Sequence, residues 1–309
     1  MTMKKLLLPA LAAVVALGSC SKTTESQPDR SDYLGIGGLT TVDLATKAEL
    51  PAGTLGAGSI GVFAFRGTDY SDNNVQYSYG TPKWTAATPI PLTDVGAKVY
   101  AYYPYQATVQ GTAAAPTLTF ADNNIADPVD YLYSGIVQKT DNTGDMEFTK
   151  TNYTVNPLKM YHALAKIVFV KAQDATYPGA GVISSITLKN KAGQSVLVAG
   201  GTLDIKTGVI TPNSTTTAYT FLTGNTNSFK TGAVSASKMV VPASIAAAGN
   251  AVAEIVMDGN TYNLDLPAGT WVKGTINTYT LTVSTSGLEI QSVEVQDWMT
   301  GLNVNLPIE

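Results

Sequence analysis

Apolar and polar residues alternate along much of this 309-residue chain. In the clearest stretch, Thr278–Ser284, Tyr279, Leu281 and Val283 alternate with threonine and serine. Successive side chains of a strand point to opposite faces, so a period of two predicts a strand with one buried face and one exposed face. β-branched and aromatic residues favour the same structure. The alternation therefore restricts the chain to folds built from β-strands.

A β-hairpin is predicted around Asp258-Gly259, a pair that can adopt the positive φ angles of a two-residue turn. Strand-like runs flank it at Ala251–Met257 and Thr261–Leu266. One helical turn is expected at Ala243–Ala248. Further strand-length runs, separated by Gly, Pro, Asn and Asp, lie at Ile60–Phe65, Val99–Tyr103, Tyr131–Val137, Lys166–Lys171, Ile183–Leu188 and Met239–Val241.

Many short strands with frequent turns predict an all-β chain with β-sandwich architecture. The length allows one large domain or two domains of ordinary size. Asn156-Pro157 and the loop around it predict a seam, which places an N-terminal domain at 48–160 and a C-terminal domain at 161–309.

The N-terminal residues have the form of a secretory signal. Lys4 and Lys5 precede the apolar run Leu6–Leu17, which is too short for a stable transmembrane helix. Leu17-Gly18-Ser19-Cys20 resembles the lipobox of bacterial lipoproteins. That resemblance implies removal of residues 1–19 and acylation of Cys20, which would anchor the protein to a membrane. The alternative is an ordinary signal followed by a chance cysteine.

Ser21 after Cys20 resembles a signal for sorting to the outer membrane, and the polar residues 21–32 are predicted to form a tether. Removal of Lys4 and Lys5 with the signal leaves 17 basic and 23 acidic residues, a net charge of −6. This acidity argues against nucleic acid as a partner, because nucleic acid binding needs a basic face. Cys20 is the only cysteine, so a disulfide within the chain is impossible.

His162 is the only histidine and is expected to be a packed, structural residue. A catalytic triad needs a base held near a nucleophile, and nothing in the sequence marks such partners for His162. With one histidine and a lipidated Cys20, a usual zinc site is excluded. No pair of carboxylates stands out for glycoside hydrolysis. The sequence therefore predicts neither an enzyme nor a cofactor.

Three weaker patterns have a structural and a functional interpretation. Gly56–Gly61 matches G-x-G-x-x-G, but it follows a loop and opens a strand, so a flexible turn is expected instead of a dinucleotide site. Asp141–Asp145 and Asp122–Asn124 are expected to be turns, with calcium binding as the alternative. A set of aromatic residues is expected to pack in the core and at sheet edges instead of forming a sugar-binding platform: Trp84, Tyr100, Tyr102, Tyr103 and Tyr105.

A series of short segments follows the lipobox in a fixed order. They are Thr46-Lys47-Ala48, Gly61–Phe65, Trp84 with Pro89–Leu92, Val99–Tyr105, Asp130–Tyr133, Tyr161–Ile167, and Lys273-Gly274 with Tyr279–Val283 and Val295–Trp298. In this order they resemble the fimbrillin family, the type V pilins of Bacteroidales. The resemblance covers nearly the whole chain after the signal.

This resemblance implies two transthyretin-like β-sandwich domains in tandem and travel to the outer membrane as a lipoprotein. It also implies that a trypsin-like, usually Arg-specific protease removes residues 20–47, and that the groove left behind accepts a strand from the next subunit. The chain is then expected to be a structural subunit of a cell-surface fimbria that supports adhesion. The expected partners are other fimbrial subunits in a head-to-tail homopolymer or heteropolymer, the processing protease, membrane lipid, and a host or bacterial adhesion ligand.

Two segments suit such an exchange of strands. The segment expected to be removed runs over Tyr33–Ala45, where one parity carries Leu34, Ile36, Val42 and Leu44, with Gly38 and Thr40 between them. The segment expected to be donated lies at the C-terminus, where alternate positions carry Val304, Leu306 and Ile308. Main-chain pairing and alternate side chains would set the affinity and the register of the exchange.

The expected processing site is Lys47-Ala48, where the family usually has arginine. Either the protease accepts Lys47, or this subunit stays uncut and serves as an anchor or minor fimbrial subunit. Two other classes remain as alternatives: a surface lipoprotein that binds glycans or proteins, and a secreted hydrolase.

Overall fold

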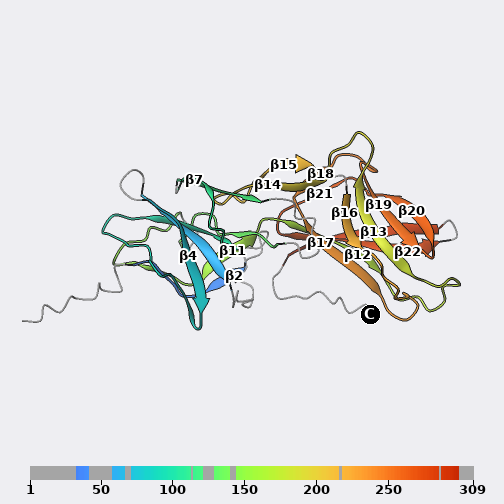
Figure 1. Ribbon diagram of the computed structural model, residues 1–309, viewed down its shortest axis with the longest axis horizontal. Coiled ribbons are helices and arrows are strands. Elements are labelled where there is room, and N and C mark those ends of the chain that lie inside the picture. Colours follow the sequence, from blue (N-terminus) through green and yellow to red (C-terminus); the bar gives the residue numbers. More distant parts are fainter. Residues whose placement is uncertain are drawn as a thin grey trace, which may run out of the picture. The chain divides into compact units, whose positions relative to one another are not determined.

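The computed structural model describes residues 33–41, 58–66, 71–112, 114–120, 129–139, 144–215, 218–284 and 287–298. All of them belong to the compact unit formed by residues 31–309. Within these ranges every regular element is a β-strand, so the predicted all-β class with β-sandwich packing is confirmed (Figure 1). The same ranges contain no helix that is long and apolar enough to span a membrane.

The largest sheet has nine strands in the order β10-β1-β5-β4-β3-β6-β9-β11-β2. Its central strand β3 is an apolar run that is buried along most of its length, as expected for a strand covered on both faces. The strands of this sheet are β1 (Gly35–Ile36), β2 (Leu39–Thr41), β3 (Ser59–Phe65), β4 (Ser71–Gly80), β5 (Lys83–Thr85), β6 (Lys98–Tyr103), β9 (Leu132–Tyr133), β10 (Thr154–Val155) and β11 (Leu158–His162).

A β-sandwich is formed by two four-stranded sheets of orders β17-β12-β22-β23 and β16-β13-β19-β20. The first contains β12 (Ala165–Lys171), β17 (Val234–Val240), β22 (Thr275–Ser284) and β23 (Gly287–Asp297). The second contains β13 (Ile183–Asn190), β16 (Ala218–Leu222), β19 (Ala251–Met257) and β20 (Asn260–Asp265). Both sheets contribute to one apolar core, which includes Phe169, Tyr279, Ile186 and Ile255.

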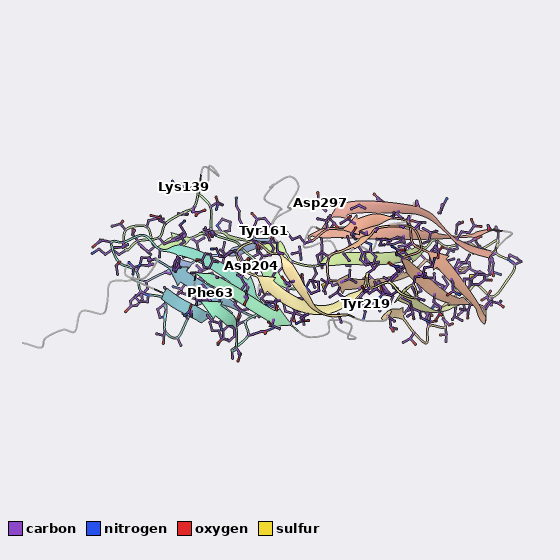
Figure 2. All side chains as sticks on the ribbon, turned by 90° about the horizontal axis from the view of Figure 1, so that it is seen from above. Phe63, Lys139, Tyr161, Asp204, Tyr219 and Asp297 are labelled. Atoms are coloured by element: carbon purple, nitrogen blue, oxygen red, sulfur yellow. The ribbon has the colours of Figure 1, made fainter. Side chains whose placement is uncertain are left out.

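A further sheet joins segments that are distant in sequence, in the order β15-β14-β8-β7. It contains β7 (Gln110–Thr112), β8 (Ala115–Phe120), β14 (Val198–Asp204) and β15 (Ile210–Thr215), and a two-stranded sheet contains β18 (Ala243–Ile245) and β21 (Gly269–Trp271). Buried residues of β8 and β14 share a core with Phe63 of β3 and Val168 of β12. Phe63 and Tyr219 lie among the strands, whereas Lys139 lies at the surface (Figure 2).

The local sequence signals for strands are confirmed where they are strongest. The alternating stretch Thr278–Ser284 lies in β22. Asp258 and Gly259 have φ angles of 51° and 80° and connect β19 to β20, which pair antiparallel as the hairpin prediction requires. The prediction of a domain boundary at residue 160 stays a prediction.

Two sequence-based predictions need correction. The helical turn expected at Ala243–Ala248 is wrong, because residues 243–245 form β18 and Ile245 is buried, so pairing with β21 overrides the helix propensity of alanine. The strand expected at Tyr131–Val137 is reduced to β9, Leu132–Tyr133. Gly135 has a φ of 63°, a left-handed conformation that interrupts the strand.

Candidate functional site

Residues 33–41, which we term the N-terminal segment, pair with strands from later in the chain. β1 pairs in parallel with β10 and antiparallel with β5. β2 pairs in parallel with β11, which lies beside it in Figure 1. The Gly35 N–H donates to the Tyr153 carbonyl at 2.7 Å, and the Gly37 N–H donates to the Val155 carbonyl at 3.0 Å. Main-chain hydrogen bonds therefore hold the segment as an integral part of the nine-stranded sheet.

Three apolar side chains of the N-terminal segment are buried. Leu34 and Ile36 are each 2% exposed and Leu39 is 1% exposed. All three belong to the core that also contains Ile60 and Val62 of β3. Burying an aliphatic side chain of this size contributes about 1.5–3 kcal/mol relative to exposure. Loss of the segment would therefore open an apolar groove bordered by unpaired strand edges.

The described part of the segment departs from the continuous alternation expected over Tyr33–Ala45. Leu34 and Ile36 are buried on one parity, but Leu39 is buried on the other. The change occurs at Gly37-Gly38, beside the bend between β10 and β11. A Cβ atom on Gly37 would lie 2.6 Å from Cγ of Asn156, so only glycine lets the segment pass this bend without a shift of the asparagine.

Sequence reasoning missed two residues that hold the segment, Leu39 and Tyr77. The glycine pair is a signal for an interrupted strand and could have indicated the shift in parity that buries Leu39. The buried Tyr77 hydroxyl donates to the Leu34 carbonyl at 3.0 Å. No local pattern could have revealed this contact, because it joins positions that are 43 residues apart.

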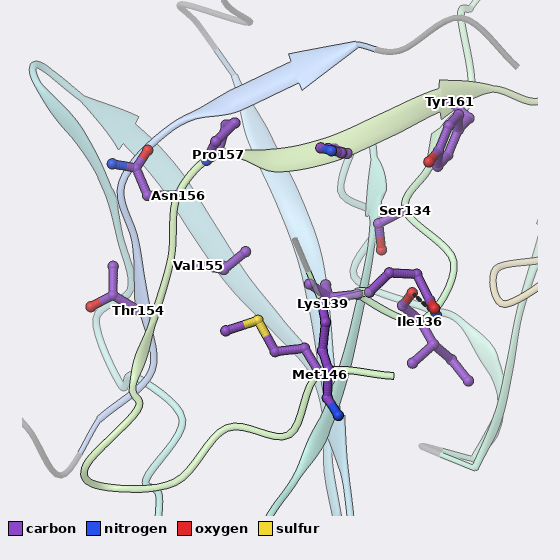
Figure 3. Close-up of a pocket in the computed structure, with 12 residues that line it drawn as sticks. Ser134, Ile136, Lys139, Met146, Thr154, Val155, Asn156, Pro157 and Tyr161 are labelled. Atoms are coloured by element: carbon purple, nitrogen blue, oxygen red, sulfur yellow. Dashed lines mark hydrogen bonds between the residues drawn. The ribbon is translucent and has the colours of Figure 1, made fainter. Parts of the chain in front are cut away.

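A pocket of about 200 Å³ lies next to the strands that bind the N-terminal segment (Figure 3). Pairing of β9 with β11 stops at Tyr133 and Tyr161, and the chain segments beyond these residues line the pocket. Val155 and Met146 come from opposite walls (Figure 3). Its lining combines apolar, hydroxyl, amide and cationic groups, namely Ile136, Val137, Met146, Val155, Pro157, Ser134, Thr154, Tyr161, Gln138, Asn156, Lys139 and Lys159.

Most of the sequence-predicted processing and exchange residues lie outside the described residues. These are the lipidation candidate and the processing site, Cys20, Lys47 and Ala48. They also include half of the removed-strand candidates and all of the donor-strand candidates, namely Val42, Leu44, Val304, Leu306 and Ile308. The structure therefore places only Leu34 and Ile36 of this set, and it brings both into one core.

His162 is packed as predicted, with an exposed fraction of 1%. Two partners were not expected. Its Nδ1 atom lies 3.0 Å from the Asp130 carboxylate, and its ring stacks on Trp298 at 4.1 Å with an interplanar angle of 5°. Because the carboxylate can only accept, Nδ1 carries the donated proton. In the described part of the chain the buried Nε2 atom has no hydrogen-bond partner.

The aromatic residues considered for a sugar platform are mainly core residues. Trp84, Tyr100 and Tyr102 are buried, and Tyr103 and Tyr105 are partly buried. Burial raises the pKa of Tyr100 and of Tyr102 to about 12, so both phenols stay neutral at physiological pH. The core interpretation of the three buried residues is therefore confirmed.

Of the two Asx-rich segments expected to be turns, only Gly144 and Asp145 lie within the described residues. The Asp145 carboxylate accepts hydrogen bonds from Lys98 at 2.6 Å and from Gln138 at 2.9 Å. These hydrogen bonds, with that of Lys98 the stronger, hold the pKa of Asp145 below its ordinary value. Among the residues that the structure describes, no group of three or more His, Cys, Asp or Glu side chains is arranged to hold a metal ion.

A second hollow, of about 650 Å³, lies beside the edge strand β23. Val293 and Val295 line it and are exposed. Trp271 and Tyr279 also line it, but both are buried, and the Trp271 indole donates to the Tyr279 hydroxyl at 2.9 Å. The hollow thus offers aliphatic surface next to a strand edge instead of an aromatic platform for sugars.

These features describe an all-β protein with β-sandwich packing whose largest sheet includes a short segment from near the N-terminus. The chain belongs to the fimbrillin-like family, whose sequence profile matches residues 46–298. The resemblance to fimbrillins is thereby confirmed. A relative from Bacteroides uniformis, provisionally named fimbrium subunit Fim1C, is 26% identical over 323 residues, which cover 96% of each chain.

Solved structures show the same fold at lower sequence identity. A protein from Bacteroides uniformis, provisionally described as a cell adhesion protein, has a TM-score of 0.60 and 21% identity, over 87% of this chain and 100% of that chain. A fimbrial protein from Bacteroides vulgatus has a TM-score of 0.55 and 18% identity, over 86% of this chain and 99% of that chain. Both likenesses concern the fold.

Proposed function

We propose that this chain is a structural subunit of a cell-surface fimbria that supports adhesion, and that its role is assembly and not catalysis. Membership of the fimbrillin-like family and the full-length match to a fimbrium subunit support this proposal. The proposed route begins with export as an outer-membrane lipoprotein acylated at Cys20. In the assembled fibre the chain would comprise the two domains 48–160 and 161–309.

The observation that carries the proposal is the way the N-terminal segment is bound. It supplies three buried side chains and pairs with β5, β10 and β11. Cleavage at Lys47 would separate the segment covalently from the rest of the sheet. Once the segment left, its apolar groove and unpaired strand edges would be costly in water, and a strand of another chain would satisfy both.

The proposed donor is the C-terminal stretch Asn303–Glu309 of a neighbouring subunit. Val304, Leu306 and Ile308 occupy alternate positions, so in a strand they share one face. That face would fill the groove while the main chain pairs with the exposed edges. A contact between a groove on one subunit and a tail on the next does not close on itself, so it produces a filament.

The direct test is substitution of the proposed processing residue. Lys47→Ala should leave soluble monomers where the parent forms ladders on unheated gels. Lys191→Ala provides a matched control, because Lys191 is exposed and directly follows β13, a strand that does not pair with the N-terminal segment. Normal ladders from Lys47→Ala would refute processing at this residue.

The donor is tested separately. Replacement of Val304, Leu306 and Ile308 by serine should abolish polymerisation without preventing cleavage, because the groove would receive no apolar side chains. Replacement of Asn303 and Asn305 by serine changes the opposite face of the same stretch and should be tolerated. Equal polymerisation by both variants would exclude this stretch as the donor.

The membrane anchor and the place in the fibre are tested on the native protein. Cys20→Ala should release the protein from the membrane or block its maturation, and unchanged partition into the detergent phase would exclude lipidation. Mass spectrometry of surface-shed protein should find Ala48 at the N-terminus. An N-terminus at Cys20 would favour the second candidate function, an uncleaved anchor or minor subunit, which is the alternative that a lysine at position 47 leaves open.

A further inference from the structure

The stack of His162 on Trp298 joins two parts of the chain that the proposed function uses separately. The rings are 4.1 Å apart and nearly parallel, and Trp298 is 9% exposed. His162 ends β11, the strand that pairs with β2 of the N-terminal segment. Trp298 directly follows β23 and directly precedes residues 299–309, which we term the C-terminal tail. This contact therefore connects the proposed acceptor sheet to Trp298, the residue that precedes the segment carrying the proposed donor strand.

Main-chain hydrogen bonds place Trp298 for this contact. Its N–H donates to the Gly274 carbonyl at 2.7 Å, and the Gly274 N–H donates to the Leu164 carbonyl at 2.8 Å. Leu164 is two residues beyond His162. The backbone of Trp298, where the C-terminal tail begins, is therefore connected through Gly274 to the stretch that carries the histidine. The indole is thus held both by its ring and by its backbone.

Two charged groups reinforce the orientation of the rings. Asp130 accepts a hydrogen bond from Nδ1 of His162 and fixes the plane of the imidazole. The ammonium group of Lys166 lies 5.9 Å from the centre of the Trp298 ring, within the range of a cation–π interaction. Each ring therefore has a contact beyond the stack, which limits the orientations that it can adopt.

We propose that the His162–Trp298 stack fixes the point at which the C-terminal tail leaves the subunit, and that this makes the subunit an effective strand donor. The inference rests on the proposed function. If the residue before the tail is already held in place, less conformational freedom is lost when the tail enters a neighbour's groove. His162 and Trp298 are then positioning residues for assembly, because they act on the tail and do not touch the neighbour's groove.

The test uses two full-length chains that can react in one direction only. Lys47→Ala keeps its N-terminal segment and can only donate, and the chain with serine at 304, 306 and 308 can only accept. Mixing them with the processing protease should give a dimer, whose rate of formation is followed on unheated gels. His162→Ala in the donor should lower this rate about fivefold, the factor that corresponds to the ~1 kcal/mol of an aromatic pair. Trp298→Leu in the acceptor should leave the rate unchanged, because Trp298 follows β23 and is not part of the acceptor sheet.

Conservative variants separate positioning from folding. His162→Phe in the donor keeps a flat ring against Trp298 and should restore the parental rate, although it removes the hydrogen bond to Asp130. Trp298→Leu keeps apolar volume without the ring and should behave like His162→Ala. If His162→Ala does not fold, Trp298→Leu and His162→Phe still give opposite expectations.

A spectroscopic signature reports the stack itself. The chain has three tryptophans, so fluorine NMR of 5-fluorotryptophan protein should give three signals. Only that of Trp298 should move in His162→Ala, whereas those of the buried Trp84 and Trp271 should stay.

The possible failures are distinguishable. If the parental pair forms no dimer, the proposed function fails before His162 is tested. If the parental pair reacts and His162→Ala donates at the parental rate, the inference about the stack is overturned. An equal decrease in the rate of dimer formation, whether the substitution is in the donor or in the acceptor, would also overturn it, since that result indicates a general structural role.

Discussion

The hydroxyl of Tyr77 donates a hydrogen bond to the main-chain carbonyl of Leu34 at 3.0 Å. The same hydroxyl accepts the N–H of Ile90 at 3.2 Å, and the Leu34 N–H donates to the Ile90 carbonyl at 2.8 Å. Three residues thus share a closed set of buried hydrogen bonds, and one of them belongs to the N-terminal segment. The hydrogen bonding of the core therefore depends on the presence of that segment.

Tyr77→Phe should lower the free energy of unfolding of the intact protein by about 1–3 kcal/mol, because the buried Ile90 N–H and Leu34 carbonyl lose a partner. Urea unfolding followed by tryptophan fluorescence measures this change. Tyr79→Phe on the same strand is the matched control, since Tyr79 is only partly buried and packs its ring against Trp84.

The loss should be smaller in a chain whose N-terminal segment has been cut and released. The Leu34 carbonyl has then left, so only the Ile90 N–H remains to be satisfied. Equal losses in the intact and the released forms would contradict the coupling between Tyr77 and the segment.

Gly61→Ala should destabilise the protein by about 1–3 kcal/mol or more, because it overpacks the core. A Cβ atom at this position would lie 2.1 Å from Cε1 of Tyr102, a buried ring whose hydroxyl donates to Asn74 at 2.7 Å. Thermal unfolding measures the effect. Gly61 is also the last glycine of the G-x-G-x-x-G pattern, so its role is close packing inside β3.

Gly80→Ala is the matched control, because Gly80 also lies in a strand and a Cβ atom there would meet nothing within 4 Å. We expect a change within about 0.5 kcal/mol. Similar losses from both substitutions would indicate that strand glycines matter here for a reason other than contact with Tyr102.

Strands whose chemistry is local could be predicted from the sequence. β19 alternates strictly between buried and partly buried residues, and Asp258-Gly259 supplies the turn that its hairpin needs. β12 contains Ile167–Val170, a run of β-branched and aromatic residues that favours a strand. In these elements the local pattern and the tertiary environment favour the same structure.

Features that depend on distant partners could not be predicted. Ala243–Ile245 becomes a strand only because Gly269–Trp271 pairs with it. β8 and β14 pair across a large separation in sequence, from Thr117 with Asp204 to Phe120 with Gly201. The stack between His162 and Trp298 has the same origin. In the candidate site, the alternation of the sequence indicated that Leu34 and Ile36 share a buried face, but it did not indicate the contacts that hold them.

The stability of the protein in acid should depend on Asp258. Burial acts to raise the pKa of this carboxyl, but N–H groups of Val182 and Gly181 donate to it at 2.8 and 3.0 Å and, with the Tyr177 hydroxyl, outweigh burial. The pKa of Asp258 is therefore lowered from its ordinary 3.8. A lowered pKa means that the carboxylate stabilises the fold above pH ~4 and that this contribution is lost as the pH falls through the pKa of the folded state.

Asp258→Asn should accordingly lower stability at pH 7 and reduce the difference in stability between pH 7 and pH 2. Asparagine also tolerates the positive φ of this position, so the turn itself is kept. Urea unfolding at the two pH values measures the difference. If the free energies of unfolding of parent and variant differed by the same amount at pH 7 and at pH 2, Asp258 would not titrate in the way proposed.

The N-terminal segment should remain bound after cleavage until another strand replaces it, because its hydrogen bonds and its three buried side chains do not depend on the covalent link. Its release can be followed on protein cut at residue 47, by size exclusion with mass spectrometry of the free peptide. Ile36→Ala removes most of a side chain that is 2% exposed. We expect release to accelerate at least ~10-fold, because large-to-small substitutions in a core cost about 2–5 kcal/mol.

Thr40→Val should have the opposite effect. Within the described residues, the Thr40 hydroxyl is buried without a hydrogen-bond partner, and valine has the same shape without the polar group. Because an unsatisfied buried hydroxyl destabilises the bound segment, its removal should slow release. Opposite shifts from two substitutions in one segment cannot come from a general loss of stability. If both substitutions accelerated release of the segment, or if neither did, burial of these side chains would not control how long the segment stays in its groove.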